Sequence, residues 1–204
     1  MEDLQAADVP ALLAEFRQQP LTYRKRVIWA LAYLGGAEVR DEFIRKLEAD
    51  YQLREFDDAE RSAILRVAKA LGLVSRNDDE AFRYILDHTT PENWTGMRRW
   101  NGPRNRDSDD ALADQMVVAL GLSGRPEADE VLQSVLAWDP RDLKKVDGGL
   151  MDAHFYLATW RDEGMKKVIE YCATIEGFSA YGRWHGTEEA KRFQEEIHKR
   201  LGNR

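Results

Sequence analysis

Apolar residues recur along most of this chain at every third or fourth position, with charged residues between them. Val27, Ile28, Leu31 and Leu34 form one such run, and comparable runs follow it along the chain. This spacing places the apolar side chains on one face of an α-helix, because the helix turns once every 3.6 residues. No segment alternates apolar and polar residues between hairpin turn signals. The pattern therefore predicts an all-α chain.

A short segment closes several of these runs and is followed by an acidic helix start. It reads Ala-Leu-Ala-Tyr-Leu-Gly at 30–35, Ala-Leu-Gly-Leu-Val-Ser at 70–75 and Ala-Leu-Gly-Leu-Ser-Gly at 119–124. A weaker copy begins at Tyr156, so successive copies lie 40, 49 and 37 residues apart. A period near 40 is typical of two-helix repeats, which bury their apolar faces only when neighbouring pairs stack.

The segment also indicates how the pairs would pack. Gly72 and Gly121 would let the backbone turn or let neighbouring helices approach closely, since glycine has no Cβ. Leu31, Leu71 and Leu120 occupy matching positions in the three copies. We therefore expect these leucines to be buried between stacked pairs.

The third copy and the residues after it, Ala-Leu-Gly-Leu-Ser-Gly-Arg-Pro-Glu-Ala at 119–128, carry a family resemblance. They resemble the HEAT-like repeats first described in phycobiliprotein lyases. The resemblance covers roughly residues 21–175 and departs from the family at Arg125, where aspartate often precedes the proline. It implies an α-α superhelix, a HEAT-like α-solenoid of about four helix pairs with capping helices. It does not imply bilin chemistry.

The termini fit one domain with a polar cap at each end, as stacked repeats require. Apolar residues at helical spacing predict a capping helix over 8–18 and another over 187–201. The glycine- and aromatic-rich stretch 177–186 interrupts the pattern, and we expect a loop there. The expected divisions of the single domain 1–204 are an N-terminal cap (1–20), the repeats (21–175) and a C-terminal loop with its cap helix (176–204).

Composition narrows the function classes. The net charge of -7 and the pI near 5.2 argue against a general nucleic-acid binder, which usually has a basic surface. The one cysteine, Cys172, cannot form an intramolecular disulfide, and its apolar neighbours favour a packed thiol over a reactive nucleophile. The N-terminus shows no secretory signal, and the longest apolar run, 27–37, is too short to span a membrane. We expect a cytoplasmic protein with no membrane contact.

The strongest binding candidate is the insertion at 89–109, which accounts for the long interval of 49 residues. It is rich in arginine and tryptophan, residue types that suit anionic or aromatic partners. The stretch 177–186 again pairs arginine with aromatic residues. In the alternative reading, the tryptophans only pin these segments and the arginines are solvated. The candidate binding residues are Trp94, Arg98, Arg99, Trp100, Arg104, Arg106, Arg183 and Trp184.

Other chemistry-bearing residues favour structural roles. The acids Asp107, Asp109, Asp110 and Asp114 lack the glycine and the distal glutamate of a calcium loop, so helix capping explains them better. His154 lies among apolar residues and is expected to pack within a helix. No phosphate-binding loop, dinucleotide fingerprint or nucleophile elbow occurs. We expect no catalytic residue, metal or cofactor.

These observations favour a protein-binding scaffold or adaptor over an enzyme. The expected partner is a protein, one whose acidic segment would meet the arginines of the insertion. The alternative is a nucleic-acid-processing enzyme that resembles the HEAT-like DNA glycosylases. Those enzymes use tryptophan, aspartate and arginine, which the insertion contains, but no catalytic position matches and the overall acidity opposes duplex binding.

Overall fold

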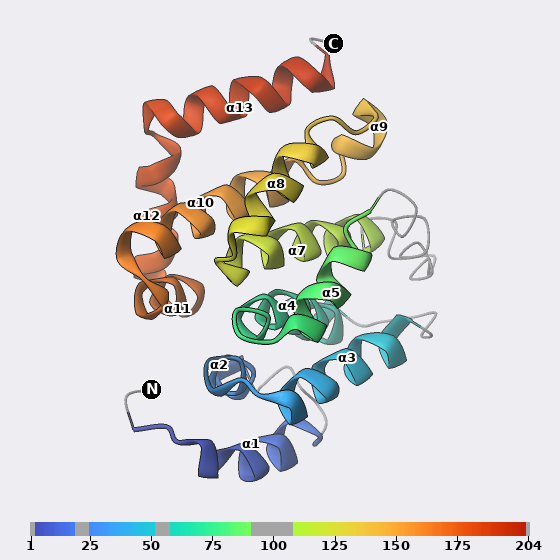
Figure 1. The fold of residues 1–204 in the computed structure, drawn as a ribbon, viewed down its shortest axis with the longest axis vertical. Helices are drawn as coiled ribbons and strands as arrows, with labels where there is room; N and C mark the ends of the chain where they lie inside the picture. Colours follow the sequence, from blue (N-terminus) through green and yellow to red (C-terminus); the bar gives the residue numbers. More distant parts are fainter. Residues whose placement is uncertain (1–2, 19–24, 52–57, 91–107, 203–204) are drawn as a thin grey trace.

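The computed structural model describes residues 3–18, 25–51, 58–90 and 108–202. All regular structure in these ranges is helical, which confirms the all-α expectation (Figure 1). None of the described helices has the length and apolar character that a membrane crossing requires. The elements are η1 (Ala6–Asp8), α1 (Val9–Phe16), α2 (Lys25–Leu34), α3 (Ala37–Tyr51), α4 (Asp58–Val74), α5 (Asp79–Asp87), α7 (Ser108–Ser123), α8 (Pro126–Val135), α9 (Pro140–Leu143), α10 (Asp147–Glu163), α11 (Met165–Ala173), α12 (Ile175–His185) and α13 (Glu188–Leu201).

Four helices, α2, α4, α7 and α10, form a continuous layer, which we call the inner layer. Each packs against the next, and Figure 1 shows them one above another between the two chain ends. The helix that follows each of the first three packs on this layer: α3 against α4, α5 against α4 and α7, and α8 against α7 and α10. The apolar stripes predicted from the sequence are buried between these helices.

The last helices close one side of the inner layer. Helix α11 packs against α10 and α12 and also reaches back to α2, so distant parts of the chain meet there. Helix α1 packs on α2 and α3 at one end, and α13 packs on α9, α10 and α12 at the other (Figure 1). These two helices occupy the ranges where the sequence predicts capping helices.

The ends of the inner helices can be compared with the spacing of the segments matched in the sequence. The last residues of α2, α4, α7 and α10 lie at intervals of 40, 49 and 40 residues. Glycines with positive φ follow three of these ends: Gly35 at 66°, Gly124 at 64° and Gly164 at 81°. The sequence match at Tyr156 therefore places the fourth copy three residues too early. That copy lacks the Ala-Leu-Gly segment, and its terminal glycine is the feature that marks its register.

Two glycines allow the inner helices to approach closely, as the sequence predicts. A Cβ on Gly72 would lie 2.4 Å from the carbonyl oxygen of Ala119, and one on Gly121 would lie 2.2 Å from that of Ala153. The α4–α7 and α7–α10 contacts thus both depend on the missing side chain. The leucines matched in the first three copies are also buried, with no measurable exposure, as expected: Leu31, Leu71 and Leu120.

The expected loop at 177–186 is wrong, because α12 covers this stretch. The Thr174 side chain caps the helix by accepting a hydrogen bond from the Gly177 backbone N–H at 3.2 Å. Gly177 also lets α12 fold tightly onto α11, since a Cβ there would lie 2.1 Å from the Tyr171 backbone. Gly177 therefore permits close helix packing and does not mark a loop.

Candidate functional site

A cavity of about 550 Å³ lies between the inner layer and α11, and we call it the inner pocket. Helix α4 forms the longest wall, because Ser62, Arg66 and Lys69 follow one another at helical spacing along one face. The other walls come from α2, α7 and α11, so four helices line this open cavity. The residues lining it are Trp29, Ser62, Leu65, Arg66, Lys69, Gln115 and Cys172.

Beside the pocket lies a group of ionisable side chains from five helices, which we call the inner polar cluster. Its geometry is set by side-chain contacts between α4, α10, α11 and α12. The Lys69 ammonium lies over the Tyr156 ring, with 4.8 Å between Nζ and the ring centroid. The Tyr156 hydroxyl hydrogen-bonds to the Cys172 sulfur. The members are Lys69, Asp114, Asp152, Tyr156, Cys172 and Tyr181.

Asp114 is held at the contact between α7 and α10. The Gly149 backbone N–H donates a hydrogen bond to Oδ1 of Asp114. A Cβ on Gly149 would lie 2.5 Å from that oxygen, so the glycine is what admits the carboxyl group. Burial raises the pKa of Asp114 to about 7; the negative charge of Asp152 adds to the rise, and the Gly149 hydrogen bond and Lys69 oppose it.

Asp152, on α10, is a second buried carboxyl group of the cluster. Burial raises the pKa of its carboxyl group, while the positive charge of Lys69 and a hydrogen bond from the Tyr181 hydroxyl oppose the rise. Burial and the nearby Asp152 charge raise the pKa of Tyr181 in turn. The charge of Lys69 therefore acts on both carboxyl groups.

Cys172 joins the inner pocket to the inner polar cluster. Burial raises the pKa of its thiol to about 11, so the sulfur carries a proton at neutral pH. A thiol that keeps its proton is a weak nucleophile. This geometry agrees with the packed, unreactive cysteine that the sequence favours.

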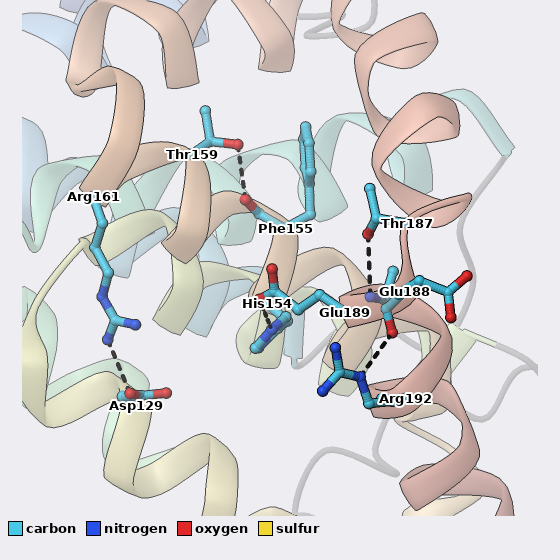
Figure 2. A network of polar contacts seen from close by, with 10 residues as sticks. Asp129, His154, Phe155, Thr159, Arg161, Thr187, Glu188, Glu189 and Arg192 are labelled. Carbon is cyan, nitrogen blue, oxygen red and sulfur yellow. Dashed lines mark hydrogen bonds and ion pairs between the residues drawn. The ribbon is translucent and has the colours of Figure 1, made fainter.

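Helix α10 presents its cluster residues on one face and is anchored by the other. Arg161 forms an ion pair with Asp129 of α8 at 2.9 Å, and His154 lies 3.0 Å from Glu189 of α13 (Figure 2). The His154 ring also stacks on Phe193, with 4.3 Å between centroids. His154 is therefore a packed helical residue, as expected. These contacts fix the position of α10, and with it the cluster residues on its inner face.

Most of the binding residues expected from the sequence lie outside the described residues. These are Trp94, Arg98, Arg99, Trp100, Arg104 and Arg106. The other two lie on α12. Arg183 is exposed, and the Trp184 ring packs on Phe155 and Tyr181, with 5.5 and 5.8 Å between centroids. Trp184 thus belongs to an aromatic cluster between α10 and α12, and both residues line a separate cavity of about 200 Å³.

The structure corrects the reading of Asp114 as one of the acids that cap a helix. Asp114 lies six residues into α7, beyond its first turn, and faces α10 instead. Sequence reasoning also missed Lys69, Asp152 and Tyr156. The available signal was an ionisable residue inside an apolar helical stripe, as Lys69 is between Ala68 and Ala70.

The chain was compared with protein families, curated proteins and solved structures. No protein-family model matches this chain, and neither do the curated proteins or the solved structures.

Proposed function

We propose that this chain is a binding module built as a HEAT-like α-solenoid, with its ligand held in the inner pocket. The intervals of 40, 49 and 40 residues between the ends of the inner helices, and the packing of each on the next, support the solenoid. The return of α11 to α2 supports a curved inner layer, because it brings the helix that follows α10 back to the first inner helix. Such curvature creates the concave surfaces on which stacked-helix proteins hold ligands.

The observation that carries the proposal is the position of the inner polar cluster beside a cavity. Removing carboxyl and ammonium groups from water costs free energy, and a chain that needs only to pack helices would fill these positions with apolar residues. Ionisable groups with shifted pKa values gather at functional sites for this reason. A cavity of about 550 Å³ is also within the range of small-molecule sites.

The protonation states of the cluster favour binding over covalent catalysis. The pKa values of Tyr156, Cys172 and Tyr181 are all raised, so the three groups keep their protons at neutral pH. They are suited to donating hydrogen bonds rather than attacking a substrate. The protein partner expected at the insertion stays a prediction, since its arginines lie outside the described residues.

The test is to fill the cavity and ask which ligands are lost. Ser62→Trp places an indole in the inner pocket, whereas Ser134→Trp makes the same change on the exposed face of α8. We expect a fragment set of mixed charge, followed by ligand-observed NMR, to give hits that Ser62→Trp removes. Ser134→Trp should retain these hits. A set in which no hit depends on the cavity contradicts the proposal.

A further inference from the structure

One cation of the inner pocket has no counter-charge among the residues that the structure describes. The Nη1 atom of Arg66 is shielded from solvent and has no hydrogen-bond partner. Burial alone lowers the pKa of Arg66, and no described acidic side chain acts against that effect. A guanidinium group has five N–H donors in a planar fork, so an unpaired and partly buried one is costly.

Two other partly buried arginines of the described chain are each paired with an acid. Arg40, with 15% of its side chain exposed, forms an ion pair with Asp78 at 3.0 Å. Arg125, with 17% exposed, forms one with Asp79 at 2.8 Å. Arg66 differs from both in having no such acid among the described residues. Arg76 is also partly buried and lacks an acid, but its guanidinium group lies over the Trp160 ring, 5.9 Å from the centroid. Arg66 is set apart by its shielded Nη1 atom, which has no hydrogen-bond partner.

We infer that the inner pocket binds a small organic anion, whose carboxylate or phosphate group pairs with the Arg66 guanidinium. This inference rests on the proposed function and names the class of its ligand. Carboxylate and phosphate match the planar fork of arginine because two oxygens accept two parallel N–H bonds.

Lys69, the second cation that lines the pocket, is less available to an anionic ligand than Arg66. Lys69 lies over the Tyr156 ring and interacts electrostatically with the carboxyl groups of Asp114 and Asp152. Neither aspartate lines the cavity, and the described residues of its lining include the two cations and no acid. Arg66 thus carries the uncompensated charge, and an entering anion would be attracted to it.

The remaining walls define the rest of the ligand. Trp29 and Leu65 supply an apolar surface from α2 and α4, while Ser62 and Gln115 supply neutral hydrogen-bonding groups. An apolar or aromatic body beside the anionic group fits these walls, since ligand sites combine apolar contacts with few polar anchors. An inorganic ion would leave the apolar wall uncovered.

Calorimetric titration with probes of one shape and different charge tests this inference. The probes are benzoate and phenyl phosphate, neutral benzamide and cationic benzylamine. We expect the two anions to bind roughly tenfold or more tightly than the other two, as hydrogen bonds between charged groups allow. Arg66→Met should remove this advantage and Arg66→Lys should restore part of it. Arg83→Met, on the exposed face of α5, should bind all four probes as the parent does.

The outcomes separate the inference from the proposed function. Neutral or cationic probes that bind best, and are lost in Ser62→Trp, overturn the anion while the binding role stands. Probes that never depend on the cavity overturn both. Preferential binding of a hexaglutamate peptide over benzoate would make the occupant a protein and also overturn the inference. If Arg66→Met does not fold, the ranking of the probes on the parent protein decides.

Discussion

Asp114 shows how one side chain links packing to proton binding. Its carboxyl group sits against the α10 backbone, and burial raises its pKa from 3.8 to about 7. Between these values the folded state holds a proton that the unfolded state has released. The free energy of unfolding therefore falls as pH rises through this window, by about 1.4 kcal/mol for each unit of pKa difference.

We predict that Asp114→Asn stabilises the protein at neutral and alkaline pH. The amide oxygen can still accept the Gly149 N–H, but no charge has to be buried. Urea unfolding measured from about pH 4 to about pH 8 should show a shallower loss of stability than in the parent. Asp162→Asn, an exposed change on α10, is the control and should leave the slope as it is. An unchanged slope in Asp114→Asn contradicts the role assigned to this carboxyl group.

At this scale the sequence predicts apolar residues better than polar ones. Leu71 could be placed in the core because an apolar side chain at helical spacing turns inward whatever its neighbour is. Lys69 and Asp152 could not be placed in a site, since their roles depend on which helix crosses nearby and on the distance between the helices. That distance is a property of pairs of elements and leaves no periodic signal in one chain.

The helix pairs are held at short separations by the glycines of the inner layer. We predict that Gly72→Ala and Gly121→Ala each destabilise the protein by ~1–3 kcal/mol, the usual cost of overpacking. The added Cβ would meet backbone atoms of Ala119 or Ala153, which have no rotamer with which to move aside. Thermal or urea unfolding measures the change.

Gly182→Ala is the matched control for these two changes. Gly182 is exposed within α12, and a Cβ there meets nothing within 4 Å. The same substitution should therefore stabilise the protein by ~1 kcal/mol, through the helix propensity of alanine alone. Equal effects at all three glycines would mean that the helices do not approach closely.

Long elements with a clear apolar period were predictable, and elements without it were not. Helix α12 was read as a loop because its glycines and aromatic residues hide the period, although Thr174 provides a normal N-cap. The fourth copy was found but misplaced by three residues, because Gly164 is the one strong marker it retains. In both places the local signal came from capping and turning residues rather than from apolar spacing.

The whole molecule builds the inner pocket from residues far apart in the sequence. Trp29 and Cys172 line the same cavity because α11 returns to α2. This contact depends on how the helices between them pack, and no single segment encodes it. The sequence therefore predicted the helices and much of the core, whereas the site could be found only once the helices were placed together.

Because the inner polar cluster lies beside the inner pocket, we expect anion binding in the pocket to depend on pH. Asp114, with Asp147 and Asp152 nearby, carries a negative charge that acts on Lys69, and it gains a proton near pH 7. Benzoate stays ionised from about pH 8 to about pH 6, because carboxyl groups in water titrate near pH 4. We predict that its affinity rises severalfold over this fall in pH, since protonating Asp114 strengthens the positive potential of the pocket.

Calorimetry with the parent and two variants measures this effect. Asp114→Asn should bind benzoate with the higher affinity throughout, and with much less dependence on pH, because its side chain cannot ionise. Asp162→Asn should follow the parent, since that exposed carboxyl group lies outside the cluster. If the dependence on pH persists in Asp114→Asn, another group controls the potential of the pocket. Loss of binding in Arg66→Met at every pH would then still identify the anchor, because the arginine remains charged throughout.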